Sequence, residues 1–130
     1  MKTKNIKQWL DVNASAQQIY DVWMDSKKHA KLVGSSAKID PKIGGKFEVW
    51  GWDITGENVE LVPGEKIVQT WRNSEWPEGV MSKITLKFKK NKDGTTRVLF
   101  WHSGIPEESL KDIEDGSKSY YWESLKEMFN

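Results

Sequence analysis

The chain has 130 residues, with 20 basic and 19 acidic side chains and a formal net charge of +1. It is therefore the size of one domain, which we place at residues 1–130, and it has no overall field to attract nucleic acid, an anionic membrane or an acidic substrate. The absence of cysteine excludes disulfides and zinc–cysteine sites and suits a reducing compartment. Because we find neither a signal peptide nor a membrane-spanning window, we expect a cytoplasmic protein.

The first part of the chain predicts one strand and two short helices. Alternating apolar side chains indicate a strand over residues 6–12. Ser15 and Gln18 have the spacing of a capping box, so a helix should follow Ser15 directly. Asp25 can cap a second short helix, on which we expect His29 to be solvated.

The middle of the chain predicts a run of antiparallel strands. Period-2 alternation recurs in several segments, namely residues 37–40, 46–52, 66–72, 82–88 and 96–102. Pro63 and Gly64 should form a tight turn, because proline presets φ and glycine accepts the positive φ that follows. A β-bulge is expected between Asp53 and Asn58, and Gly104 should end the last strand.

A long amphipathic helix is predicted at the C-terminus. Glu107, Glu108 and Ser109 supply acids and a capping hydroxyl where a helix N-terminus favours them. One apolar stripe, interrupted by a serine, follows: Leu110, Ile113, Ser117, Tyr121, Leu125 and Met128. Gly116 lies within this helix at a cost of about 1 kcal/mol relative to alanine, so we expect packing to require a small residue there.

The order of elements indicates an α+β protein in which a curved antiparallel sheet of six to seven strands wraps around the final helix, with two short helices after the first strand. Several motifs in this frame resemble the C-terminal domain of the activator of heat-shock protein 90 ATPase, a family of the START-like helix-grip superfamily. They are Ile54-Thr55-Gly56-Glu57, Leu61-Val62-Pro63, Lys66-Ile67-Val68, Trp71-Arg72, Trp76-Pro77-Glu78-Gly79, Ser82-Lys83-Ile84-Thr85-Leu86, Gly104-Ile105-Pro106 and Tyr120-Tyr121.

The resemblance implies a chaperone-associated interaction module and a heat-shock protein 90 family chaperone as partner. The activators have an additional N-terminal domain that we do not see here, so we expect only slight stimulation by this domain alone. The family typically shows Gly-Trp where this chain has Gly116-Ser117. Tyr20, Trp23 or Trp71 should refill that space, or it should remain as a pocket.

The resemblance also implies a cavity between the sheet and the C-terminal helix, and hence an alternative function as a binding protein for a small apolar ligand. We expect its lining to be Phe47, Val49, Ile67, Gln69, Trp71, Ile84, Leu86, Val98, Phe100, His102, Ser117 and Tyr121. The polar members of this set are either satisfied core groups or ligand contacts.

Catalysis requires more than one titratable group in a cleft. His102 alone is placed to serve, and no acid lies at strand spacing to orient it. We therefore predict a non-enzymatic protein with no cofactor and no metal.

Outward-facing aromatic residues suggest a partner surface. Trp9 and Trp101 share the solvent-side parity with Leu99 on neighbouring strands, although lysine and arginine stems often cover such rings. Trp76 lies in a Trp-Pro loop, which either projects as a second contact or folds onto the rim of the sheet. The expected assembly state is a monomer or a weak homodimer.

Overall fold

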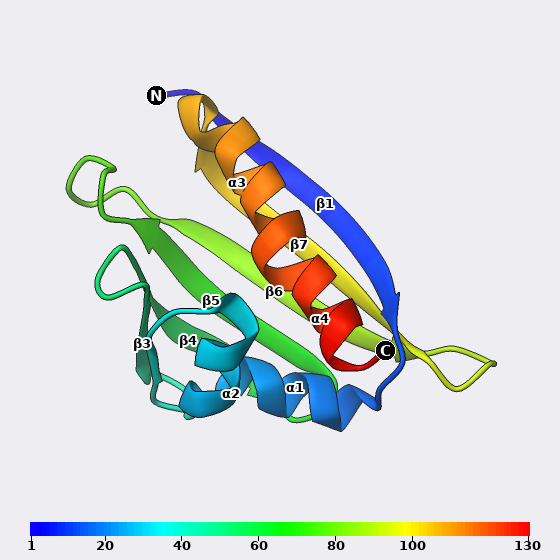
Figure 1. Ribbon diagram of the computed structural model, residues 1–130. Coiled ribbons are helices and arrows are strands. Elements are labelled where there is room, and N and C mark those ends of the chain that lie inside the picture. Colours follow the sequence, from blue (N-terminus) through cyan, green and yellow to red (C-terminus); the bar gives the residue numbers. More distant parts are fainter.

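The computed structural model describes residues 1–130 as a curved antiparallel sheet that packs against a C-terminal helix (Figure 1). The seven strands lie in the order β1-β7-β6-β5-β4-β3-β2. Their bounds are β1 Thr3–Val12, β2 Ala37–Ile39, β3 Lys46–Val49, β4 Ile54–Val62, β5 Lys66–Asn73, β6 Ser82–Lys90 and β7 Thr96–Pro106. The helices α1 (Ala16–Met24) and α2 (Ser26–Val33) lie across one end of the sheet.

Local capping fixes the two short helices, as predicted. The Ser15 hydroxyl accepts from the Gln18 backbone N–H, and the Gln18 side chain accepts from the Ser15 N–H, which completes the capping box. Asp25 caps α2, and Gly34 ends it in the left-handed conformation at φ 71°. The expectation for His29 is wrong, because this residue is 3 % exposed and its ring is enclosed by the core.

The predicted strands are present, with changes at their ends. β7 continues to Pro106 instead of ending at Gly104, because it pairs with β1 up to Thr3. β3 stops at Val49, short of residue 52, because Trp50 at φ 55° turns the chain. The bulge in β4 lies between Asn58 and Glu60, just beyond the predicted stretch. The tight turn at Gly64, with φ 72°, is confirmed.

The C-terminal helix is continuous but not uniform. It begins with a 3₁₀ turn over Glu107–Ser109, continues as α3 (Leu110–Gly116), widens to a π-helical segment over Ser117–Trp122 and ends as α4 (Glu123–Met128). The wide turn shifts the inward face by one residue, so Trp122 is buried while Tyr121 is half-buried. Ser109 makes no capping bond.

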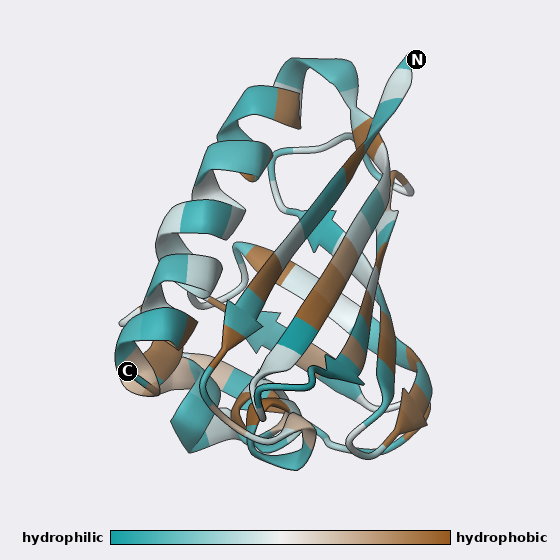
Figure 2. Ribbon diagram, turned by 90° about the vertical axis from the view of Figure 1, so that its right-hand side faces the viewer, coloured by the Kyte–Doolittle hydropathy of each residue, from teal (hydrophilic) through white to brown (hydrophobic).

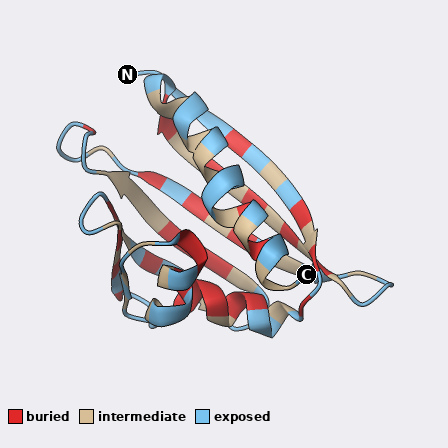
Figure 3. Ribbon diagram, in the orientation of Figure 1, coloured by how far each residue is buried: buried red, intermediate tan, exposed pale blue.

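The core fills the space between the concave face of the sheet and the helices. Buried positions alternate along the strands (Figure 3). The strands also alternate in hydropathy, and the C-terminal helix beside them is largely hydrophilic (Figure 2). Ile19, Ile67, Leu86 and Leu125 have no exposed surface. None of the helices has both the length and the apolar composition needed to cross a membrane.

Two glycines give a matched test of this packing. An alanine Cβ at Gly56 would overlap the Thr70 carbonyl oxygen and the Phe47 ring. At Gly116 the nearest atom, Tyr120 Cδ2, would be 3.9 Å away, so packing does not require a small residue there, contrary to expectation. We expect Gly56→Ala to lower the free energy of unfolding by about 2 kcal/mol and Gly116→Ala to raise it by about 0.5 to 1 kcal/mol. Urea denaturation followed by circular dichroism measures both, and equal values for the two variants would contradict this account.

Candidate functional site

A cavity of about 340 Å³ lies between the C-terminal helix and the sheet. Half of the residues predicted to line such a cavity do so, namely Trp71, Ile84, Phe100, His102, Ser117 and Tyr121. The others do not reach it. Val49, Ile67, Gln69, Leu86, Val98 and Phe47 are instead buried in the surrounding core.

Gln69 belongs to a satisfied polar chain inside the core. Its Oε1 accepts from the Trp23 indole N–H at 3.1 Å, and its Nε2 donates to Asn58 Oδ1 at 2.8 Å. Asn58 in turn donates to the carbonyl oxygens of Asp40 and Lys42 at 2.7 and 2.9 Å. These hydrogen bonds join α1 to the sheet and to the β2–β3 turn. Because the side-chain amides of Gln69 and Asn58 already have partners, they offer nothing to a ligand.

His102 lies in the cavity wall as a neutral imidazole. Its Nε2 is 2.7 Å from Ser82 Oγ, and that hydroxyl donates its one proton to the Trp71 carbonyl oxygen, so the imidazole N–H must be the donor. Burial lowers the pKa of His102 to about 3. With Trp71 edge-on at 4.9 Å and no carboxylate in contact, this histidine has no partner for acid–base chemistry.

His29 joins α2 to the C-terminal helix. Its Nδ1 bonds the Trp23 carbonyl oxygen at 2.8 Å, and its Nε2 bonds the Tyr121 hydroxyl at 2.9 Å. Burial lowers the pKa of His29 and raises that of Tyr121. The two histidines therefore act as structural groups in separate places, and no cluster of three or more His, Asp or Glu side chains is arranged to hold a metal.

Several cavity residues were not predicted. Trp122 was missed because the π-helical segment turns it inward, where its indole donates to Gln8 Oε1 at 2.7 Å. Trp50, Asp53, Asp112 and Tyr120 were missed because they lie where the cavity meets solvent, beyond any alternating pattern. The one visible signal was the Trp50-Gly51-Trp52 sequence, since turns are built mainly from Gly, Pro, Asn, Asp and Ser, and here two tryptophans flank the glycine.

The space next to Ser117 is partly filled. Trp23 packs against Tyr121 and Trp122, with ring centroids 4.6 and 6.1 Å apart, and Trp71 borders the same space. Ser117 itself bonds Gln8 Oε1 and the Ile113 carbonyl oxygen. The two expected outcomes therefore occur together, because aromatic rings of the core occupy part of this space and the rest remains as a pocket.

A second candidate site is the solvent-facing side of β1, β7 and β6, which we call the outer face. It consists of Lys7, Trp9, Asp11, Lys83, Thr85, Lys87, Lys89, Arg97, Leu99 and Trp101. Trp9 is 59 % exposed, while Leu99 and Trp101 are half-buried. Of the two outcomes expected for Trp76, the folded loop is the one found: Trp76 is 6 % exposed, and its indole donates to Ser109 Oγ at 3.0 Å, which holds the loop against the C-terminal helix instead of the rim of the sheet.

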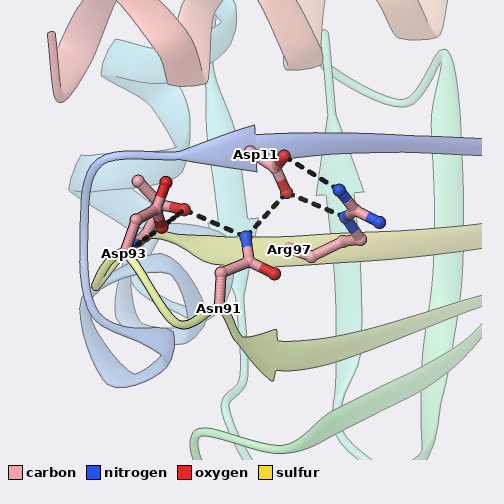
Figure 4. Close-up of polar contacts among 5 residues, drawn as sticks. Asp11, Asn91, Asp93 and Arg97 are labelled. Carbon is pink, nitrogen blue, oxygen red and sulfur yellow. Dashed lines mark hydrogen bonds and ion pairs between the residues drawn. The ribbon is translucent and has the colours of Figure 1, made fainter.

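Cationic groups lie over both tryptophans of the outer face. The Arg97 guanidinium is 4.1 Å from the Trp9 ring centroid, and Lys7 and Lys87 lie 5.9 and 5.7 Å from that of Trp101. Arg97 is held in place by both carboxylate oxygens of Asp11, at 2.9 and 3.1 Å (Figure 4). This contact, together with a hydrogen bond from Asn91, lowers the pKa of Asp11.

The curved antiparallel sheet closed by a long C-terminal helix defines a START-like helix-grip protein. The family model for Activator of Hsp90 ATPase homolog 1-like protein matches residues 13–130. The chain belongs to this family.

Curated relatives agree with this assignment. The chain is 34 % identical to an activator of 90 kDa heat shock protein ATPase homolog from Dictyostelium discoideum, over 98 % of this chain and 33 % of the relative. It is 32 % identical to the human homolog 1, over 88 % of this chain and 34 % of that protein. The chain thus spans about a third of the length of these relatives.

Solved structures show the same fold. An HSP90 activator from Plasmodium falciparum superposes with a TM-score of 0.89 at 23 % identity, over 95 % of this chain and 94 % of that chain. The solution structure of an Aha1 dimer from Colwellia psychrerythraea superposes with a TM-score of 0.78 at 18 % identity, over 97 % and 96 % of the two chains.

Proposed function

We propose that this chain is a non-catalytic module that binds a 90 kDa heat-shock chaperone and stimulates its ATPase. Family membership supports this proposal, because relatives at 34 and 32 % identity carry activator names. Since the chain spans about a third of those relatives, we expect a weaker effect than theirs. The cysteine-free composition supports a cytoplasmic setting.

The outer face is the observation that carries the proposal. Its cations are Lys7, Lys83, Lys87, Lys89 and Arg97, whereas its one carboxylate, Asp11, is already paired with Arg97. The whole chain has a net charge of only +1, so positive charge is concentrated on this face. An exposed tryptophan, Trp9, and a half-buried one, Trp101, within a basic surface fit a partner that presents acidic and apolar groups together.

Binding should depend on the two tryptophans of this face. We expect Trp9→Ala and Trp101→Ala each to weaken chaperone binding by about tenfold or more, because large aromatic rings dominate interface energies. Calorimetric titration with purified chaperone measures the affinity, and the ATP turnover of the chaperone measures the stimulation. Trp52→Ala is the matched control, since Trp52 is 80 % exposed but lies in the β3–β4 loop outside the outer face.

The outcomes separate two claims. Unchanged affinity in both variants would remove the outer face from the contact, whereas no binding by the unaltered chain would overturn the proposed function. Light scattering of the same samples gives the mass of the free chain and tests for a homodimer, the state named for the Colwellia structure.

A further inference from the structure

The cavity between helix and sheet has an unusual combination of lining groups. Seven of its 16 lining residues are aromatic, namely Trp23, Trp50, Trp71, Phe100, Tyr120, Tyr121 and Trp122. Its charged side chains are Asp53 and Asp112, and no lysine or arginine lines it although the chain has 20 basic residues. The faces of aromatic rings and the carboxylates both present negative potential, so both kinds of lining group favour a positively charged ligand.

The two carboxylates lie at the opening, since both are exposed residues of the lining. Asp53 comes from the β3–β4 loop and Asp112 from α3, so they approach the opening from its two sides. Neither is neutralised by an ion pair. Asp53 accepts the Ser74 hydroxyl at 2.9 Å through one oxygen, and the neighbouring Lys111 is engaged at 2.9 Å by Asp115.

A strained residue holds one aromatic wall of the opening. Trp50 has φ 55°, a left-handed conformation that bulky side chains rarely adopt and that recurs at functional sites. Its backbone N–H donates to the Ser36 carbonyl oxygen at 3.0 Å, and the Gly51 N–H donates to Ser36 Oγ at 3.0 Å. The turn thereby holds the Trp50 ring against Tyr120 of the C-terminal helix, with centroids 5.3 Å apart.

We propose that this cavity binds an organic cation carried on an apolar stem. The ammonium or guanidinium lies at the opening between Asp53 and Asp112, against the rings of Trp50 and Tyr120. The stem enters the aromatic space beneath. The volume of about 340 Å³ is within the range of small-molecule pockets, roughly 300 to 1,000 Å³. A free amine and the lysine side chain of a partner protein offer the same chemistry.

Three probes with one carbon skeleton test the charge requirement. They are 3-phenylpropylamine, 3-phenylpropan-1-ol and 3-phenylpropionate. Each is titrated into the nitrogen-15-labelled protein while the tryptophan indole N–H resonances are followed by NMR. We expect the amine to bind about fivefold more tightly than the alcohol, and the carboxylate to bind most weakly. Equal affinity for amine and alcohol, or no binding of the amine at millimolar concentration, would overturn the proposal.

Conservative variants locate the charge effect. Asp53→Asn with Asp112→Asn should remove the preference for the amine while leaving the affinity for the alcohol unchanged, which also shows that the cavity remains folded. Glu123→Gln with Glu127→Gln is the control, because this pair also removes two negative charges from the C-terminal helix, lies outside the lining and leaves the Lys111–Asp115 ion pair intact. Loss of the preference in the control as well would reduce the effect to general electrostatics and overturn the assignment to these carboxylates.

A final pair of probes distinguishes the source of the cation. A capped Leu-Lys-Leu peptide and its acetyl-lysine form differ by one charge. Stronger shifts at the same resonances with the unmodified peptide support a lysine from a partner protein, whereas shifts with the amine alone support a small molecule. This proposal does not depend on the chaperone function, since no chaperone enters the assay.

Discussion

Replacing Trp23 with alanine is expected to lower the free energy of unfolding by about 3 to 5 kcal/mol, the usual range for removing a buried tryptophan. Trp23 is 4 % exposed and packs against Tyr121 and Trp122 of the C-terminal helix. Its indole N–H also satisfies Gln69 Oε1 at 3.1 Å, so the variant loses a hydrogen bond as well as volume. The cost is high because one side chain joins α1, the sheet and the C-terminal helix.

Chemical denaturation followed by far-ultraviolet circular dichroism measures this loss without relying on tryptophan emission. Trp52→Ala is the control, since Trp52 is 80 % exposed and its removal should change the free energy of unfolding by no more than about 0.5 kcal/mol. Trp23→Phe separates the contribution of the hydrogen bond from that of ring packing, because it retains an aromatic ring and loses the indole N–H. A loss below about 1 kcal/mol for Trp23→Ala would show that neighbouring rings collapse into the vacated space.

The parts of the fold that could be predicted from the sequence are those set by neighbours a few residues apart. The Ser15 capping box, the Pro63-Gly64 turn and the alternation of β6 and β7 each depend on spacings of two to four residues. Such interactions are visible in the sequence, and they recur in the structure at the expected positions. The fold class followed from their order.

Burial caused by distant residues could not be predicted in this way. His29 looked solvated because its helix is short and lysine-rich, yet it is enclosed through a bond to Tyr121, 92 positions later in the chain. Trp76 looked exposed in a polar loop, but Ser109 of the C-terminal helix anchors its indole. In both residues a polar atom on an aromatic ring finds its partner on an element that only tertiary folding brings near.

The cavity was predicted in part for a related reason. Residues on the sheet side, such as Phe100 and His102, were found because strand alternation gives their direction. The opening was missed because it depends on where β3 ends and on the π-helical segment, which moves Trp122 inward and leaves Tyr120 at the rim. Neither a positive φ at a tryptophan nor a wide helical turn has a regular sequence signature.

Acidification is expected to destabilise the protein through His102 before its carboxylates protonate. Burial holds the pKa of folded His102 at about 3, compared with the ordinary value of 6.5. Between these values the unfolded chain binds a proton that the folded chain does not, so stability is full above about pH 6.5 and falls as the pH decreases toward 3. The buried His29, whose pKa is also lowered, acts in the same direction.

The expected loss through His102 is about 2 to 3 kcal/mol between pH 7 and about pH 4.5, since each pH unit in this window costs about 1.4 kcal/mol. Urea unfolding at a series of pH values measures this slope. His102→Gln should remove the share of His102 and leave that of His29, because glutamine donates to Ser82 Oγ without titrating. The ion pair of Asp11 with Arg97 weakens only at still lower pH, because the pKa of Asp11 lies below its usual 3.8. An unchanged slope in His102→Gln would show that the folded protein accepts the imidazolium. The burial of His102 argues against this, since the carboxylates of the cavity, Asp53 and Asp112, lie at its exposed opening and not beside the ring.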